Sequence, residues 1–238
     1  MAAADEGETA AFEALVQRYG LDSAASEALM ELWSRLSDDA QAPTAINGRC
    51  AVLEQHLADS LVGLEVPALV EAGTVADLGS GAGLPGLALA ASLPRLEVRA
   101  IESQRSKCAY ISSLAAAAGL ANVRVVCARA EQWPEGMEAN DAVVARALAA
   151  QPVVLEYAAP LLRLGGHLVE WRGRREQAEE AAADAAAAVL GLERLEVRRV
   201  KPFAAAEHRH LHVFVKRDAT PARFPRRPGV AARRPLGG

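Results

Sequence analysis

The sequence TVADLGSGAGLPG (residues 74–86) decides the fold of this chain. It begins with the apolar residues of a short strand, passes through Asp77 and enters a loop with glycines at positions 79, 81, 83 and 86, after which LALAASL favours a helix. Glycines permit positive φ and let a ligand approach bare N–H groups, and the first turn of a helix adds unpaired donors. The stretch therefore predicts a strand, a tight loop and a helix start that together bind a ligand of nucleotide-like polarity.

Two kinds of ligand suit this loop. Gly81, Gly83 and Gly86 have the G-x-G-x-x-G spacing of dinucleotide-binding loops, which would indicate NAD(P). Asp77 stands two residues before the first of three alternating glycines, and a carboxylate there would repel a pyrophosphate. S-adenosylmethionine contains no phosphate and carries an ammonium and a sulfonium, so it fits Asp77 better. We predict an S-adenosylmethionine site, and the alternatives are a dinucleotide site or a turn that binds nothing.

The length and charge of the chain limit its function classes. Its 238 residues allow one sizeable α/β domain with an appendage, or two small domains. A formal charge of −4 excludes a uniformly basic nucleic-acid binder, so any nucleic-acid contact must come from local patches. The acidic start MAAADEGETA differs from a signal peptide, and the apolar runs are too short to span a membrane. We therefore expect a soluble cytoplasmic protein with no membrane contact.

The three cysteines, Cys50, Cys108 and Cys127, are far apart in the sequence. Their spacing matches no metal motif, so we expect no metal site. An odd number of unpaired cysteines fits a reducing compartment, and we expect buried, inert thiols.

Hydrophobic periodicity divides the chain into a helical part and an alternating part. Apolar residues repeat at helical spacing over residues 8–37, with a break at Gly20, and again over 49–64. Strands are predicted at 75–78, 97–101, 123–127, 141–145 and 167–171, and helices near 84–92, 105–118, 130–134, 151–162 and 175–190. Helical crossovers make these strands parallel. Residues 195–203 and 208–217 alternate and are joined by a short link, which predicts an antiparallel hairpin.

Further candidate site residues follow the strands, because parallel strands present their carboxyl ends at one edge of a sheet. Glu102 stands 23 residues after Gly79, where an acid can accept hydrogen bonds from the ribose hydroxyls of an adenosine; it could instead cap the helix that follows. Ala130 and Glu131 follow the third strand and could read the edge of an adenine. Arg146 ends the fourth strand and would face the methionine part or the substrate, or else form a surface ion pair.

His56, Asp59 and Ser60 share one face of the predicted helix at 49–64, because residues three and four apart lie one above the other. A solvated polar edge is one interpretation. The other is that this edge lies against the mouth of the cofactor pocket.

Several motifs together resemble the RsmG (GidB) family, whose members are bacterial methyltransferases acting on N7 of a guanine in the 530 loop of 16S ribosomal RNA. The motifs are VADLGSGAGLPG, HLADSL (56–61), IESQRSK (101–107), VARAL (144–148), EHRHLHVFVKR and TPARFPRRPGVAARRPL. The resemblance implies a Rossmann-like class I S-adenosylmethionine-dependent methyltransferase fold, with a mostly parallel seven-stranded sheet, a C-terminal antiparallel hairpin and a helical N-terminal extension. On this basis we expect a helical segment at 1–66, the methyltransferase domain at 67–217 and a basic tail at 218–238.

By position, the resemblance implies that five residues contact the cofactor: Gly79, Leu84, Ala130, Glu131 and Arg146. The sequence departs from the family at two places. Glu102 stands where an aspartate is more common, and Ala42, Pro43 and Thr44 replace the Asn-Leu-Thr-like segment of the family. With the loop and strand-end residues, the expected cofactor-binding set is Asp77, Gly79, Ser80, Gly81, Gly83, Leu84, Glu102, Ala130, Glu131 and Arg146.

The chemistry of N7 methylation needs no general base. Guanine N7 already has a free lone pair, so the protein must mainly align this nitrogen with the sulfonium methyl group and exclude water. We therefore assign no catalytic base and expect Arg146 to orient the reactants.

The C-terminal tail offers the local basic patch. From Lys216 to Gly238 there are seven bases and one acid, and the prolines favour an extended segment. An arm that follows phosphates on 16S rRNA is one interpretation, and a disordered solubilising tail is the other. The expected partner is the small ribosomal subunit or its assembly intermediate, bound by a monomer. A ribosome-binding sensor that keeps the pocket without turnover is the alternative from another class. The candidate RNA-binding residues are Arg223, Arg226, Arg227, Arg233 and Arg234.

Overall fold

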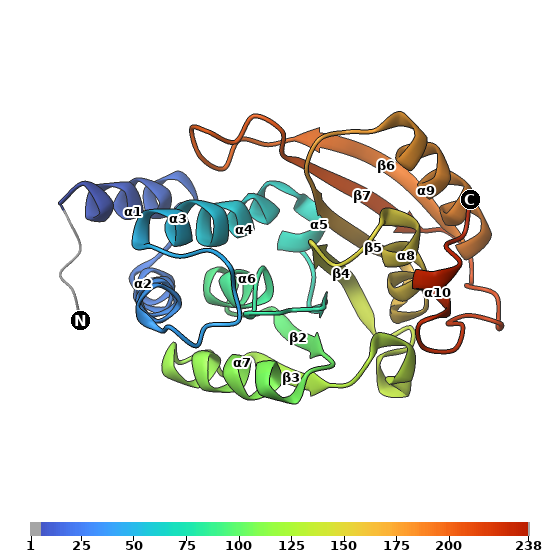
Figure 1. Cartoon of the computed structure of the whole chain (residues 1–238), viewed down its shortest axis with the longest axis horizontal. Helices are drawn as coiled ribbons and strands as arrows, with labels where there is room; N and C mark the ends of the chain where they lie inside the picture. Colours follow the sequence, from blue (N-terminus) through green and yellow to red (C-terminus); the bar gives the residue numbers. More distant parts are fainter. Residues whose placement is uncertain (1–5, 238) are drawn as a thin grey trace.

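The computed structural model describes residues 6–237, and it contains a seven-stranded sheet covered by helices on both faces (Figure 1). The strand order is β3-β2-β1-β4-β5-β7-β6. The outermost parts of the predicted N-terminal segment and tail, residues 1–5 and Gly238, lie outside the described residues.

The predicted mostly parallel sheet is confirmed. Strands β1 to β5 pair in parallel, and β7 pairs antiparallel with both β5 and β6, which forms the predicted hairpin. Leu78 pairs with Ile101, so the strand before the glycine loop ends beside the strand that carries Glu102. The bounds are β1 Thr74–Leu78, β2 Glu97–Glu102, β3 Val123–Cys127, β4 Asn140–Arg146, β5 Leu162–Arg172, β6 Leu192–Arg199 and β7 His210–Lys216.

The helices between consecutive strands divide by sheet face. α6 (Gly86–Ser92) and α7 (Arg105–Ala117) pack with α1 (Glu6–Arg18) and α2 (Ser23–Asp38) on one face. α8 (Gln151–Ala158) and α9 (Gln177–Leu190) pack on the other. This is the arrangement expected when right-handed crossovers join parallel strands.

The N-terminal helices share a core with the sheet. Asp22 caps α2 by accepting a hydrogen bond from the N–H of Ala25. Trp33 of α2 is fully buried and stacks on Phe12 of α1 with ring centroids 5.5 Å apart. Side chains of α2 and of α6 belong to one hydrophobic cluster, so these helices pack together and support the glycine loop that precedes α6.

Four predicted elements differ from the structure. The helix predicted at 130–134 is only a 3-10 turn, Ala130–Gln132, because Pro134 and a short connection leave no room for more. α8 ends at Ala158, four residues early, since a second 3-10 turn at Ala159–Leu161 leads directly into a long β5. α6 starts at Gly86, because turns occupy residues 80–85. The hairpin link spans 200–209 and is longer than predicted.

The prediction of buried thiols is correct for Cys108 and wrong for the other two cysteines. Cys50 and Cys127 are exposed. Cys127 ends β3, where the chain leaves the sheet toward solvent.

The segment predicted as one helix at 49–64 contains a change of helical type. After α3 (Arg49–Val52) it forms a π-helical turn at Leu53–Ala58, then α4 (Asp59–Leu61) and a 3-10 turn at Val62–Glu65, and α5 (Pro67–Val70) follows. A π turn shifts the register of the residues after it and is common at functional sites. Here it lies in the segment that carries His56 and Asp59, which are 7% and 5% exposed.

The prolines predicted an extended C-terminal tail, but the structure shows a folded one. It makes turns and a short helix, α10 (Val230–Arg233), which packs against α8 at the end of the molecule opposite the N-terminal helices (Figure 1). Phe224 and Ala231 are buried, and burial of apolar side chains stabilises the folded tail against the protein. Among the residues that the structure describes, no helix is both long and apolar enough to cross a membrane.

Candidate active site

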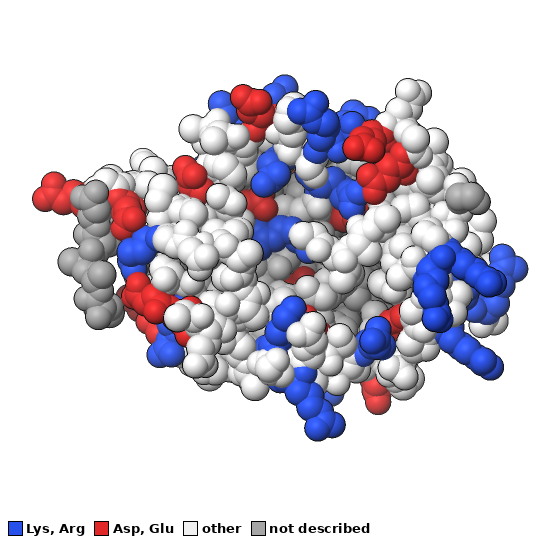
Figure 2. Space-filling model, in the orientation of Figure 1, with Lys and Arg blue, Asp and Glu red and all other residues white. Residues whose placement is uncertain are grey.

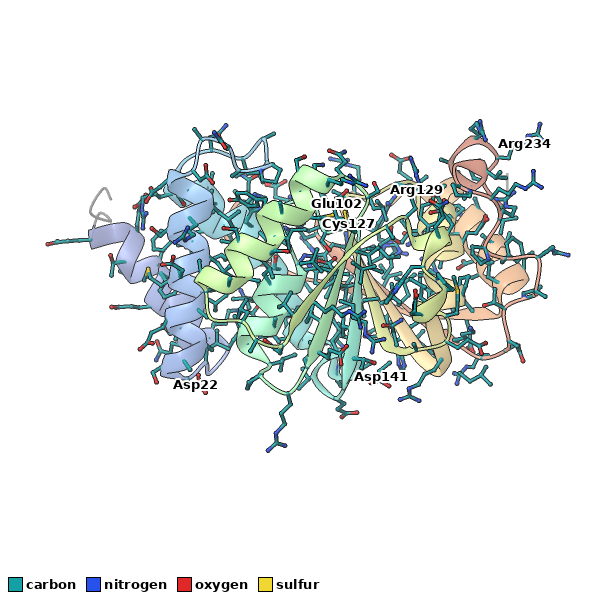
Figure 3. All side chains as sticks on the ribbon, turned by 90° about the horizontal axis from the view of Figure 1, so that it is seen from below. Asp22, Glu102, Cys127, Arg129, Asp141 and Arg234 are labelled. Atoms are coloured by element: carbon teal, nitrogen blue, oxygen red, sulfur yellow. The ribbon has the colours of Figure 1, made fainter. Side chains whose placement is uncertain are left out.

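A cavity of about 820 Å³ lies at the carboxyl ends of the parallel strands. Its wall combines the glycine loop, the ends of β2 and β4, the turn after β3 and the segment that carries His56. In Figure 3, Glu102, Cys127 and Arg129 lie close together at this edge of the sheet, and Asp141 marks the opposite edge. Figure 2 shows the molecule hollowed near the centre of this face, with charged side chains around the hollow.

The glycine loop exposes its backbone to the cavity. Gly79 and Gly81 have φ of 65° and 59°, values that residues other than glycine rarely adopt. A Cβ at Gly79 would stand 2.5 Å from Cδ1 of Leu148, whereas a Cβ at Gly81 would have an ordinary contact at 3.7 Å with the carbonyl oxygen of Gly79 and nothing closer. The N–H groups of Gly79 and Ser80 both donate to the carbonyl oxygen of Ile101, at 2.9 and 3.1 Å, and so fix the loop on β2.

Asp77 does not line the cavity, which corrects its prediction as a cofactor contact. Its side chain is 1% exposed and lies beneath the loop, where Oδ2 accepts a hydrogen bond from the N–H of Gly86 at 3.0 Å. Oδ1 is buried without a hydrogen-bond partner among the described residues. Burial raises the pKa of Asp77 to about 6. Gly83 is also absent from the cavity wall, and a Cβ at this position would meet the side chain of Leu87 of α6.

Glu102 forms one side of the cavity and braces the loop. Its Oε2 accepts a hydrogen bond from the N–H of Gly81 at 3.2 Å, and its Oε1 accepts one from the N–H of Gln104 at 2.8 Å. The carboxylate therefore organises the turn before α7 and also faces the cavity, but it does not cap α7, whose N-cap is Gln104. Oε1 also accepts from the hydroxyl of Ser103 at 3.4 Å, whereas Oε2 has a second lone pair that can accept from a ligand hydroxyl.

Ala130 and Glu131 lie at another end of the cavity, in the turn after β3. Tyr157 of α8 lies in the wall beside them. Oε1 of Glu131 accepts a hydrogen bond from the backbone N–H of Gly229, in the tail, at 3.3 Å. The tail thus reaches the same end of the cavity, where Ala232 also forms part of the wall.

Arg146 belongs to a polar cluster on the opposite side. Its Nη1 donates to Oδ2 of Asp59 at 3.1 Å, and Oδ1 of Asp59 accepts from Nε of Arg209 at 3.2 Å. Trp171 donates from Nε1 to the carbonyl oxygen of Asp59 at 2.6 Å. One buried carboxylate therefore links the two arginines and holds both against the cavity.

His56 completes this cluster. Its Nδ1 lies 3.5 Å from Nη2 of Arg146, and its Nε2 lies 2.8 Å from Oγ1 of Thr44. Burial and, to a smaller extent, the positive charge of Arg146 lower the pKa of His56 to about 4. The imidazole is therefore neutral near pH 7. The predicted polar edge of this helix is buried against the pocket, and the solvated interpretation is wrong.

Eight of the ten residues predicted to bind the cofactor lie in the cavity wall, and only Asp77 and Gly83 do not. Sequence reasoning missed Arg209, Trp171, Tyr157 and Leu148 as parts of the wall. For Leu148, Trp171 and Arg209 the available signal was position, because each lies near the end of a strand at the carboxyl edge of the sheet. Tyr157 lies within α8 and had no such signal. The eight residues are Gly79, Ser80, Gly81, Leu84, Glu102, Ala130, Glu131 and Arg146.

The predicted RNA-binding arginines fall into two groups. Arg226 is partly buried and forms an ion pair with Glu156, so it is not a free phosphate contact. The others are exposed: Arg223, Arg227, Arg233 and Arg234.

Comparison with known proteins gives one consistent result. A family model described as GidB, rRNA small subunit methyltransferase G, matches residues 42–211. Ribosomal RNA small subunit methyltransferase G of Rubrobacter xylanophilus is 42% identical over 193 residues, covering 79% of this chain and 74% of that protein. The protein of the same name from Desulfitobacterium hafniense is 35% identical over 196 residues, covering 81% of each chain.

Solved structures agree on the fold. A SAM dependent methyltransferase from Aquifex aeolicus superposes with a TM-score of 0.55 at 18% identity, over 69% of this chain and 92% of that one. The ribosomal protein L11 methylase from Lactobacillus delbrueckii subsp. bulgaricus gives a TM-score of 0.53 at 18% identity, over 69% and 79%.

Proposed function

This chain belongs to the GidB family of rRNA small subunit methyltransferases, and we propose that, as an S-adenosylmethionine-dependent enzyme, it methylates N7 of a guanine in 16S ribosomal RNA. The observation that carries the proposal is the cavity itself. It brings the glycine loop, Glu102, the Ala130–Glu131 turn and Arg146 to one place at the carboxyl edge of the sheet, where open α/β folds bind their ligands.

The geometry of the loop favours S-adenosylmethionine over a dinucleotide. In a dinucleotide fold, loop N–H groups point at a pyrophosphate. Here the N–H of Gly81 donates to the Glu102 carboxylate, and a phosphate at this position would meet a negative charge. A ribose, by contrast, offers hydroxyl donors to that carboxylate.

The wall also suits the remaining parts of the cofactor. The cavity volume of about 820 Å³ lies in the range of small-molecule sites. The uncrowded backbone at Gly81 admits a close approach, Ala130 and Glu131 would contact the adenine, and Arg146 would face the methionine carboxylate or the substrate. When bound, S-adenosylmethionine supplies an electrophilic methyl group.

The residues of this chain would position rather than exchange protons. Guanine N7 has a lone pair, so no base is required. The pKa of His56, lowered to about 4, leaves a neutral ring that can hold Thr44 and Arg146 in place without becoming charged. Arg146, fixed by Asp59, would orient the reacting groups, and the enclosing wall would exclude water.

Two measurements test this proposal. Isothermal titration calorimetry of the full chain should give tight binding of S-adenosylhomocysteine and none of NAD; the reverse would reject the cofactor assignment. In cells that lack the protein, one guanine of 16S rRNA should lose its sensitivity to borohydride and aniline cleavage, and complementation should restore it. An unchanged cleavage pattern would reject the proposed target.

A further inference from the structure

The C-terminal tail is anchored to the protein by an ion pair between the partly buried Arg226 and a buried carboxylate. Nε of Arg226 donates to Oε1 of Glu156 at 2.7 Å, and its Nη2 contacts Oε2 of the same carboxylate. Glu156, on α8, is only 1% exposed. Arg226 also donates from Nη2 to the carbonyl oxygen of Arg234 at 2.9 Å, so one guanidinium ties the middle of the tail both to α8 and to the C-terminal part of the tail. Phe224 is 8% exposed and packs in the hydrophobic core on the face of the sheet that α8 and α9 cover.

The anchored tail forms part of the proposed adenine end of the cavity. The N–H of Gly229 donates to Oε1 of Glu131, and Ala232 lies in the wall. Tyr157, the neighbour of Glu156 in sequence, lies in the same wall. The ion pair therefore joins two segments, α8 and the tail, that both contribute residues to this part of the wall.

The other side of the tail carries free positive charge. Four exposed arginines have no carboxylate within 4.0 Å among residues 6–237, in contrast to Arg226. Figure 2 shows a group of basic side chains over α10, and Figure 3 shows Arg234 toward the same edge of the sheet as Glu102 and Arg129, opposite Asp141. The exposed group is Arg223, Arg227, Arg233 and Arg234.

We propose that residues 218–237 couple the two substrates: the Arg226–Glu156 pair holds the tail so that its inner side completes the adenine end of the cofactor site while its outer arginines bind RNA phosphates. Arg226 and Glu156 are thus positioning residues. This inference rests on the proposed function. A detached tail would lose both the Gly229–Glu131 hydrogen bond and the fixed spacing of the arginines, and a fixed array binds with a smaller entropic cost than a mobile one.

Coupling of this kind must act in both directions. If cofactor binding favours the anchored tail, it raises RNA affinity, and RNA must then raise cofactor affinity by the same factor. The Gly229 N–H donates to a carboxylate. Loss of the wall that this contact orders, taken at about the net value of one hydrogen bond, corresponds to roughly a three- to tenfold change in the dissociation constant.

The test uses the double variant Arg226→Gln with Glu156→Gln in the full chain. Removing both charges avoids leaving a buried carboxylate unpaired, which would itself unfold the region. The matched control, Arg217→Gln with Glu193→Gln, removes an exposed ion pair just before the tail. Calorimetry with S-adenosylhomocysteine should show a dissociation constant roughly three- to tenfold higher for the first pair of substitutions and unchanged for the control. Arg226→Lys, which keeps the charge, should recover part of the affinity.

A second readout separates positioning from general damage. In the wild-type chain, S-adenosylhomocysteine should tighten binding of a 16S rRNA fragment severalfold. The double variant should lose this tightening, while the control pair of substitutions should keep it. Hydrogen exchange of the wild-type protein should slow within 218–237 when the ligand binds, which requires no variant. Unchanged affinity in the double variant, or tail exchange that ignores a bound ligand, overturns the coupling alone. Failure of the wild type to bind the ligand overturns the proposed function as well.

Discussion

The free energy of unfolding of Asp77→Asn, measured relative to that of the wild type, should increase as the pH rises. Burial raises the pKa of Asp77 from 3.8 to about 6, against the opposing effect of the Gly86 N–H, and Oδ1 has no partner among the described residues. In the folded state the proton is therefore held more tightly than in the unfolded state. The contribution of this group to stability is complete below pH 3.8 and is lost as the pH rises toward 6 and above.

The size of the effect follows from the difference between the two pKa values. A difference of about 2.2 at 1.36 kcal/mol per unit gives a total cost of about 3 kcal/mol for the ionised carboxylate. About 1.4 kcal/mol of this cost develops between pH 5 and pH 8, by the same linkage relation. The carboxamide introduced by Asp77→Asn would keep an acceptor for the Gly86 N–H. Any constant penalty for this amide cancels when the two pH values are compared, and so do the other titrating groups, because both proteins contain them.

Urea unfolding of wild type and Asp77→Asn at pH 5, 6, 7 and 8 measures this difference. Asp141→Asn is the control at the opposite edge of the sheet. Burial acts to raise the pKa of Asp141, but hydrogen bonds from Arg163 and from the N–H groups of Thr74 and Gly73 outweigh it and leave the pKa lowered. Its stabilisation is complete at pH 5, so the deficit of Asp141→Asn should stay flat. A flat difference for Asp77→Asn as well would refute the argument that its charge is buried at a cost.

Two further predictions concern the ligands. Gly81→Val should reduce affinity for S-adenosylhomocysteine at least about tenfold while the protein stays folded, because the new side chain would project into the cavity. Gly119→Val has a similar strained φ, 67° against 59°, with open space around it and no place in the cavity wall, so calorimetry should show unchanged affinity. Changing the four exposed tail arginines to glutamine should weaken RNA binding and lower the slope of log K against log salt by up to about 3, with filter binding at several salt concentrations as the assay. An unaltered slope would mean that these side chains do not contact phosphates; they are Arg223, Arg227, Arg233 and Arg234.

Much of the fold could be predicted because its signals are local. Short apolar runs alternating with helical periods indicate parallel strands, and the carboxyl ends of such strands must share an edge. This logic correctly places Glu102, Glu131 and Arg146 in one cavity. The same logic misplaces Asp77, because successive side chains of a strand point to opposite faces and this one lies under α6.

The remaining parts of the site depend on contacts between distant segments, which periodicity does not reveal. The apolar spacing of residues 49–64 predicts a helix but not the π-helical turn within it, and so not the burial of His56 and Asp59. Prolines in the tail favour extension locally, but burial of Phe224 and the pairing of Arg226 with Glu156 outweigh that preference. Short connections, such as the turn at Ala130–Gln132, leave too few residues for a reliable helical signal.

The bridge made by Asp59 has a consequence for biosynthesis. Its two partners, Arg146 and Arg209, lie 87 and 150 residues later in the sequence. During translation the second arginine is therefore added only when nearly the whole chain has been synthesised. The early helices can form and pack on the ribosome, but this wall closes only after the final hairpin has left the exit tunnel. A nascent or truncated chain that stops before Arg209 therefore lacks this part of the cavity wall.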